Sequence, residues 1–314
     1  MKTPQPPPLR PAGLKTYSLL DRQSKVRVRD FARVPEPAAG AAGLIESLPD
    51  ILAGRDLREL LGLIRQARAA RRPVILGMGA HVIKVGLSPI LIRLMREGWL
   101  SALALNGAGI IHDFEIAFSG RTSEDVAVQL AAGEFGMARE TGEYLNRAIR
   151  AGARRGAGLG ESVGRMIARS KFPHRDLSLT GAAFELGLPV TVHVGIGTDT
   201  IHFHPGASGA DLGRTSLRDF FRFSEVVAGL EGGGVYLNVG SAVILPEVFL
   251  KALSYVRNQG RTLRDFSTAV FDFRHHYRPA QNVIARAVGE RGRGFYFIGH
   301  HEIMVPLVAA ALLS

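Results

Sequence analysis

Short apolar segments alternate with amphipathic stretches along most of the chain. Each apolar segment has the length of a buried strand, and the stretches between them carry apolar residues at helical spacing. Strands that are apolar throughout and separated by helices are typical of a parallel sheet covered on both faces. The pattern therefore predicts an α/β fold with a doubly wound, Rossmann-like sheet of about six strands. The expected strands are Pro73–Met78, Ser101–Asn106, Pro189–Gly195, Val235–Gly240, Ser267–Phe273 and Gly294–Gly299.

The same pattern suggests how the chain is organised. Residues 1–45 are rich in proline, alanine and arginine and are expected to form an extended N-terminal arm. Residues 46–314 are expected to form a single domain, with a helical insertion around residues 119–174, where no strand pattern occurs. A flexible lid is expected within Phe203–Gly213, because glycine, proline and serine are frequent there.

Polar residues and glycines follow every expected strand. The segments at the strand ends read GMGAH, NGAGIIHD, HVGIGTD, NVGSA, DFRHH and IGHHE. Parallel α/β sheets bind ligands at the carboxyl ends of their strands, and glycines let the backbone approach a phosphate or ribose closely. The usual GxGxxG and GxxxxGK[ST] fingerprints are absent, which argues against a P-loop NTPase.

Composition narrows the classes of protein that the chain fits. Hydrophobic residues make up 46% and charged residues 21%, which is typical of globular proteins and excludes disordered and collagen-like chains. The chain has no cysteine and no apolar run long enough for a membrane span, and its N-terminus does not resemble a secretory signal, so we expect a cytoplasmic protein. The net charge is +11, mainly from arginine, but without a nucleic-acid motif we expect no nucleic-acid partner.

Several ordered segments resemble one known family. They are VILGMGAHVIKVGLSPILIRLMREGWLSALALNGAGIIHDFEIAF, ESVGRMIARSKFPHRDLSLTGAAFELGLPV, GTDTIHFH, GGGVYLNVG, STAVFDF with YRP, and FYFIGHHEIMVPLVAAAL. Together they resemble deoxyhypusine synthase and its bacterial relatives from about Leu57 onward. The resemblance implies a homotetramer with active sites between subunits, NAD as cofactor, and a polyamine substrate such as spermidine. It places NAD contacts at Gly79, Ala80, His81, Val82, Lys84, Asn106, Gly107, Ala108, Val239, Gly240, Thr268, Ala269, His300 and His301.

The chain departs from this family where the family does its chemistry. Family enzymes pass an aminobutyl group through an imine on a lysine, and no lysine follows Lys251 here. The first loop reads Ala80-His81 where the family has Ser-Asn. The family's tryptophan, lysine, histidine and glutamate pair fall on Ala285, Ala287, about Asn238–Val239, and Ile111–His112. A faithful deoxyhypusine synthase is therefore not expected.

The remaining groups predict a related reaction without a lysine imine. Removal of hydride to NAD makes an imine on the substrate, which a free amine then attacks, as in homospermidine synthesis. The predicted catalytic residues are His112, His202 and Asp113, the histidines as bases and the aspartate as an amine holder. The predicted substrate carboxylates are Asp199, Glu247 and Asp272. Lys84 is either a cofactor contact, a solvated helix residue, or a substitute for the missing lysine.

Two other functions remain open from the sequence. The chain is alternatively an NAD-binding protein that has lost its chemistry, since the family's lysine, tryptophan and histidine are missing. It is otherwise a metal-assisted hydrolase, because His193, Asp199, His202 and His204 supply nitrogen and oxygen ligands at short spacing. Histidines in loops usually only form hydrogen bonds, so no metal site is predicted.

Overall fold

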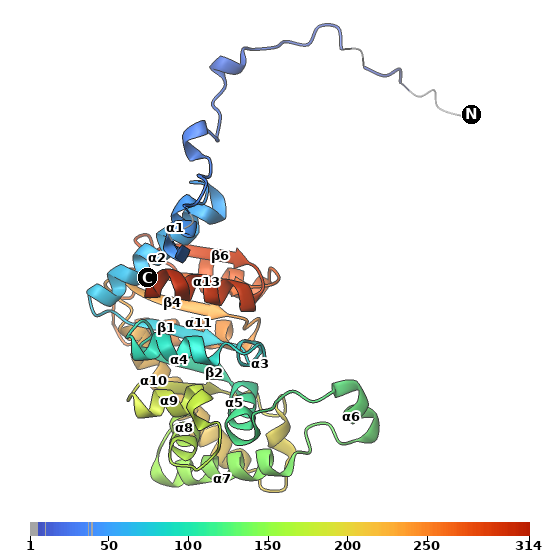
Figure 1. The fold of residues 1–314 in the computed structure, drawn as a ribbon, viewed down its shortest axis with the longest axis vertical. Helices are drawn as coiled ribbons and strands as arrows, with labels where there is room; N and C mark the ends of the chain where they lie inside the picture. The colour runs from blue at the N-terminus through green and yellow to red at the C-terminus, as the bar shows by residue number, and fades with distance from the viewer. Residues whose placement is uncertain (1–5, 10, 37, 39) are drawn as a thin grey trace.

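The fold is built on a six-stranded sheet in which every neighbouring pair is parallel (Figure 1). The computed structural model describes residues 6–9, 11–36, 38 and 40–314. The strand order β3-β2-β1-β4-β5-β6 is that of a doubly wound Rossmann-like sheet, which confirms the predicted fold class. All six strands lie where the sequence predicts them: β1 (Val74–Met78), β2 (Ala102–Asn106), β3 (Val190–His193), β4 (Gly234–Val239), β5 (Phe266–Asp272) and β6 (Gly294–Ile298).

Helices cover both faces of this sheet, and alternate strand residues point to opposite faces. Leu76 belongs to a core cluster shared with α4 and α13, whereas Ile75 belongs to a second cluster shared with α10 and α11. The helices are α1 (Gly40–Ser47), α2 (Leu52–Ala69), α3 (His81–Lys84), α4 (Ser88–Arg96), α5 (Gly107–Ser119), α6 (Val126–Ala132), α7 (Arg139–Arg155), α8 (Leu159–Ala168), α9 (Leu179–Glu185), α10 (Gly209–Ala228), α11 (Ile244–Asn258), α12 (Tyr277–Pro279) and α13 (His301–Leu313), with a π-helix at Ala280–Ala285.

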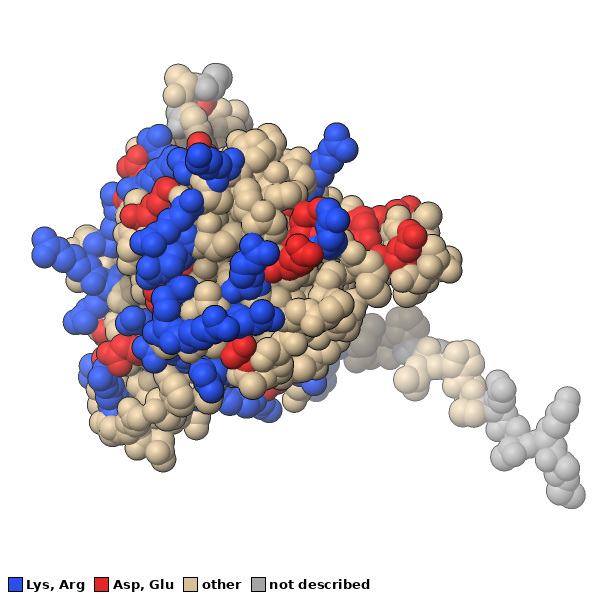
Figure 2. Space-filling view, turned by 90° about the horizontal axis from the view of Figure 1, so that it is seen from below, with Lys and Arg blue, Asp and Glu red and all other residues tan. Residues whose placement is uncertain are grey.

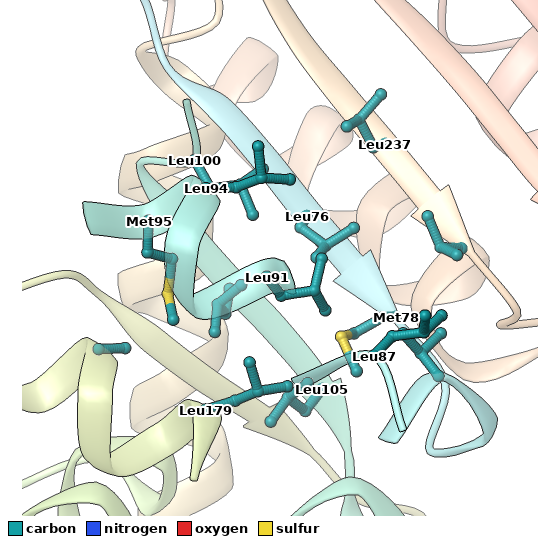
Figure 3. Packing of buried hydrophobic residues seen from close by; sticks show 14 of the residues in the cluster. Leu76, Met78, Leu87, Leu91, Leu94, Met95, Leu100, Leu105, Leu179 and Leu237 are labelled. Atoms are coloured by element: carbon teal, nitrogen blue, oxygen red, sulfur yellow. The ribbon is translucent and has the colours of Figure 1, made fainter. Parts of the chain in front are cut away.

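Close packing holds these layers together. On one face, Leu91 and Leu94 of α4 lie over Leu76 of β1, with Leu237 of β4 beside them (Figure 3). On the other face, the ring of Tyr236 stacks on Phe249 with centroids 3.8 Å apart. Gly77 makes room for that ring, because a Cβ there would overlap the Tyr236 hydroxyl. Each buried leucine contributes about 1.5–3 kcal/mol.

The free edge of β3 is covered by α10. Asp219 of α10 accepts hydrogen bonds from the backbone N–H groups of Val192 and Gly160, each at 2.8 Å. Ser216 donates to the carbonyl of Val192 at 2.9 Å. These contacts protect the edge strand and cap the N-terminus of α8. Burial raises the pKa of Asp219 to about 7.

Two segments extend from this body (Figure 1). The N-terminal arm meets the body where Asp50 N–H donates to the Asp30 carbonyl at 2.9 Å. The predicted arm boundary at residue 45 falls inside α1, whose Ile45 is buried, and residues 1–5, 10, 37 and 39 of that arm lie outside the described residues. The second segment, residues 120–138, carries α6 and is called the α6 hairpin below.

The chain between β2 and β3 forms helices α5 to α9, with no strand among its described residues. The predicted lid within Phe203–Gly213 is wrong as a flexible loop, because Ser208 caps α10 and that helix begins at Gly209. Within the described residues, every helix is too short or too polar to cross a lipid bilayer.

Candidate functional site

The strand order reverses between β1 and β4, and their C-terminal ends meet in two glycines. Gly79 N–H donates to the Val239 carbonyl at 3.0 Å, and a Cβ on Gly79 would overlap the Gly240 carbonyl oxygen. Gly240 has φ 65°, which favours glycine. The two glycines therefore let the ends of β1 and β4 pack closely at the topological switch point, the position at which such sheets bind ligands.

On the β5–β6 side of the switch point, four rings pack together. His81, Phe273, His300 and His301 have ring centroids 5.5–6.5 Å apart, and we call them the ring cluster. His301 is buried, with Nε2 3.3 Å from the Phe271 carbonyl oxygen and Nδ1 without a partner. Burial lowers the pKa of His301, so its ring is neutral at pH 7.

On the β2–β3 side lies a cavity of about 570 Å³. Its walls come from α5, the α6 hairpin, the start of α7 and the loop after β3. Four acidic and two basic residues line it, and we call it the acidic cavity. Figure 2 shows acidic side chains gathered on and beside the projecting α6 hairpin, while lysine and arginine dominate the rest of that face. The charged lining residues are Glu115, Glu124, Glu140, Asp199, Lys84 and Arg121.

Asp199 is held at the N-terminus of α5 and faces this cavity. It accepts a hydrogen bond from Ala108 N–H, and Thr198 donates to its Oδ2 at 3.3 Å. Gly107 permits this approach, because a Cβ there would overlap the carboxylate. Burial raises the pKa of Asp199, although His202, Thr198 and Ala108 oppose the shift.

His202 supports Asp199 and has no nitrogen free to act as a base. Its Nδ1 accepts from the backbone N–H groups of Gly197 at 3.0 Å and Asp199 at 3.3 Å. Nε2 therefore carries the proton, and it lies 3.8 Å from Asp199 Oδ2. Burial lowers the pKa of His202, so the ring is neutral at pH 7.

His112 lines the cavity from α5 and has a very different environment. Its Nδ1 is 2.6 Å from Thr122 Oγ1, and the same hydroxyl is 2.6 Å from Glu115 Oε2. Thr141 donates to the other oxygen of Glu115 at 3.0 Å. Burial and the nearby charge of Lys84 lower the pKa of His112 to about 4. His112 is thus a neutral imidazole in the cavity, able to accept a proton.

Asp113, the next residue on α5, points into the protein instead. It is completely buried and accepts four hydrogen bonds of 2.6–3.1 Å from Ser178, Leu179 and Thr180. Burial raises the pKa of Asp113, and the four hydrogen bonds counter that shift. Asp113 therefore caps α9, and its position does not support the predicted role in holding an amine.

The other two predicted substrate carboxylates also lie away from the acidic cavity. Glu247 is on the surface of α11, where it pairs with Lys251 and Arg278. Asp272 is buried at the end of β5, with Oδ1 3.6 Å from His276 Nε2, on the ring-cluster side. Among the predicted substrate carboxylates, the structure places Asp199 alone in the cavity.

The predicted cofactor residues lie in different environments. Thr268 and Ala269 are fully buried inside β5, and Thr268 donates to the Val283 carbonyl at 2.8 Å. Asn106 caps α5 through Gly109 N–H at 3.1 Å. Val82 and Val239 are almost completely buried, and Lys84 and Ala108 line the acidic cavity next to Gly107. The residues at the switch point or the ring cluster are Gly79, Ala80, His81, Gly240, His300 and His301.

The histidines proposed for a metal-assisted hydrolase do not form a ligand group. His193 is buried on β3, where Nε2 meets Thr191 at 3.1 Å and burial lowers the pKa of His193 to about 3. His204 bonds the Gly136 carbonyl at 2.8 Å. Within the described residues, no three histidine or acidic side chains are placed to hold a metal ion. The structure therefore gives this alternative no support.

No sequence motif marks the threonines of the acidic cavity or the buried Asp219 of α10. Thr122 and Thr141 fix Glu115 and His112, but both lie in the helical stretch, where no motif marks them. Asp219 reads as one more polar residue on a surface helix. Their roles depend on packing between segments that are distant in sequence.

Comparisons with known proteins show the fold. No protein-family model and no curated protein matches the chain. The solved complex of AgrE with ornithine and NAD⁺ is 15% identical with a TM-score of 0.50, covering 82% of this chain and 32% of AgrE. A protein assigned to the LOR/SDH group from Methanococcus maripaludis S2 is also 15% identical with a TM-score of 0.50, covering 82% and 68%.

A protein assigned as a deoxyhypusine synthase from Entamoeba histolytica is 9% identical with a TM-score of 0.47, covering 86% of this chain and 92% of that one. A TM-score below 0.5 does not establish that the two proteins share a fold. The chain spans about a third of the length of the AgrE and ArgZ structures that it resembles. At these identities the AgrE and LOR/SDH structures establish the Rossmann-like architecture alone.

Proposed function

We propose that the chain is an NAD-dependent enzyme acting on a substrate with a cationic amine. In this proposal it transfers an aminoalkyl group from a polyamine to a small amine acceptor. The observation that carries the proposal is the acidic cavity, with neutral His112 in its wall, lying along the same sheet edge as the topological switch point with its two glycines. The AgrE complex with ornithine and NAD⁺ supports the pairing of a dinucleotide and an amine on this architecture.

The residues at the switch point and in the ring cluster fit a dinucleotide. Gly79 and Gly240 bring the ends of β1 and β4 and the His301 ring close together at the switch point, and the ring cluster offers flat surfaces on which a base can stack. Nδ1 of His301 is buried and has no hydrogen-bond partner in the protein, so a bound ligand can form a hydrogen bond with it. When bound, NAD supplies the hydride acceptor that amine oxidation requires.

The side chains of the acidic cavity supply the remaining steps. Asp199 and Glu115 hold the substrate ammonium group by charge. His112 takes a proton from the substrate nitrogen as the adjacent carbon loses hydride, and a C=N bond forms on the substrate. An acceptor amine adds to this carbon, and the original C–N bond breaks to release the remainder of the donor as an amine. His112 would return its proton to the nitrogen of the new C=N bond, and bound NAD would supply the hydride for the carbon, so that no net oxidation would occur.

This route uses no lysine imine. Ala287, which aligns with the family's lysine, is buried in the core cluster under α11. Lys84 lines the acidic cavity and depresses the pKa of His112. We propose that its charge keeps His112 neutral, as a proton acceptor requires.

A second substrate class is favoured by the two cations in the cavity. Lys84 and Arg121 line the same space as the four acids. A purely cationic polyamine gains nothing from them, whereas an amino acid with a side-chain amine presents a carboxylate that both can bind. Ornithine, which is bound in the AgrE complex, has this chemistry.

The test is to incubate the purified protein with NAD and either spermidine plus putrescine or ornithine alone, and to follow products by mass spectrometry. The proposal expects a new polyamine that contains the acceptor, abolished in His112→Gln and retained in Glu185→Gln on the exposed surface of α9. Consumption of ornithine instead would select the second substrate class. NAD binding without turnover would favour the alternative without chemistry, and failure to bind NAD would overturn the proposal.

A further inference from the structure

The hydroxyl group of Thr122 lies between a histidine and a carboxylate. Its Oγ1 is 2.6 Å from both His112 Nδ1 and Glu115 Oε2. A threonine hydroxyl has one proton to donate, and a carboxylate only accepts. With Thr122 donating to Glu115, His112 must carry its own proton on Nδ1 and donate it to the Thr122 oxygen. Otherwise two acceptors would face each other at 2.6 Å.

We propose that Thr122 is a positioning residue that, backed by Glu115, fixes His112 as the Nδ1–H tautomer and leaves Nε2 as the proton acceptor in the cavity. Nε2 has no hydrogen-bond partner among the described residues and is not one of the buried unpartnered atoms, so it is open to the cavity. The use of this lone pair rests on the proposed function, whereas the tautomer is a property of the resting protein.

Thr122 belongs to a different segment from His112 and Glu115. Those two lie on α5, which ends at Ser119 and is capped by Gly120 with φ 70°, and Thr122 lies near the start of the α6 hairpin. The neck of the hairpin is closed where Gly136 N–H donates to Glu124 Oε1 at 2.8 Å. The hairpin that walls the cavity therefore also sets the tautomer of the histidine in it. Moving the hairpin away would open the cavity and would also free the tautomer of His112.

The opposite proton arrangement is the rival explanation. If Glu115 were protonated, it would donate to Thr122, Thr122 would donate to Nδ1, and His112 would carry its proton on Nε2. Thr141 on α7 donates to Glu115 Oε1 at 3.0 Å, so with Thr122 donating to Oε2 both carboxylate oxygens accept hydrogen bonds, as the proposed arrangement requires. The other charged groups in the cavity are Lys84, Arg121, Glu124, Glu140 and Asp199.

The tautomer can be read directly by long-range ¹H–¹⁵N correlation spectroscopy of protein with ¹⁵N-labelled histidine. The proposal expects His112 as Nδ1–H at pH 7 in the wild type and in Thr122→Ser. It expects the Nε2–H form to appear in Thr122→Val. Ser119→Ala is the matched control, because that hydroxyl bonds only main-chain groups near the end of α5 and should leave His112 unchanged.

A wild-type His112 in the Nε2–H form would overturn the proposal, whether or not any variant folds. An unchanged tautomer in a folded Thr122→Val protein would also overturn it. Where the enzyme turns over, Thr122→Val should lower kcat by roughly 10²-fold with KM little changed, because a wrong tautomer disables a base without removing it. Absence of turnover in the wild type would count against the proposed function and leave the tautomer result standing.

Discussion

The two ends of the sheet's C-terminal edge carry different chemistry. At the β2–β3 end, charged side chains and a neutral histidine line a cavity, and hydrogen bonds fix their orientation. At the β5–β6 end, the ring cluster presents flat surfaces, and Asp272 is buried beside it. Rings add affinity by stacking, whereas charges and a titratable base in a cavity hold and move protons. We infer that the β2–β3 end reacts and that the β5–β6 end holds the cofactor.

One histidine at each end illustrates the difference. Both His112 and His301 are neutral at pH 7, mainly because burial disfavours the charged form. His301 is anchored to a backbone carbonyl, which cannot change its charge or move far. His112 is anchored through a hydroxyl to a carboxylate on its own helix. The first arrangement suits a fixed contact, and the second suits a group that gains and loses a proton.

The largest expected effect separates reaction from binding. Replacing His112 by glutamine should lower turnover by about 10²- to 10⁴-fold, the usual contribution of a general base. NAD affinity, measured by calorimetry, should change by less than about twofold, because the ring cluster is untouched. If this variant turned over at the wild-type rate, the reaction would not take place at the β2–β3 end.

Asp113 tests whether neighbouring positions on α5 have separate roles. All four of its hydrogen bonds come from donors, so Asp113→Asn brings an amide N–H₂ against donors and weakens the hydrogen bonding at the start of α9. We expect a loss of about 3 kcal/mol in the free energy of unfolding, measured with urea. The specific activity of the folded protein should remain. If the variant kept its stability but lost its activity, Asp113 would have the predicted role in holding the substrate amine.

The sheet follows from the sequence because its strands are buried on both faces. Val74, Ile75 and Leu76 must all be apolar, since one core cluster or the other receives each side chain. A run of this kind identifies a strand without knowledge of its neighbours. The glycines at the strand ends likewise mark the ligand-binding edge, because backbone conformation and close approach restrict those positions.

The site is less accessible from sequence because direction on a helix depends on packing. His112 and Asp113 are adjacent, yet one lines the cavity and the other caps α9. Only the orientation of α5 against β2 and α9 decides between them. Thr122 has no sequence signal, since its partners lie on α5 and its position depends on the turn at Gly120. Asp199 is identifiable as a cavity residue because it lies in the glycine-containing loop that follows β3.

A smaller effect is expected at the other end of the edge. Phe273→Ala removes the ring that contacts three histidines and should weaken NAD binding by about tenfold, equivalent to about 1.4 kcal/mol. At saturating NAD, kcat should be unchanged. Measuring Kd and kcat separately checks this, and a fall in kcat with unchanged Kd would place the rings at the reacting end.

The smallest expected effect is a shift in pH dependence. Since the pKa of His112 is about 4, this base gains its proton only in acid, and kcat/KM should rise with pH through about 4 instead of 6.5. The positive charge of Lys84 disfavours the imidazolium, so Lys84→Met should move the acid limb upward, towards 6.5. Lys251→Met, which removes a surface lysine paired with Glu247, should leave it in place.

Asp199 also gains a proton in acid, but Lys84 is not among the causes of its pKa shift. A movement of the acid limb in Lys84→Met therefore reports on His112. The direction decides the interpretation, because loss of a neighbouring cation must make the imidazole easier to protonate. An acid limb that stays fixed would mean that another group is the base. It would also remove the electrostatic distinction between the two ends of the edge, since His112 would then have only a structural role, like His301.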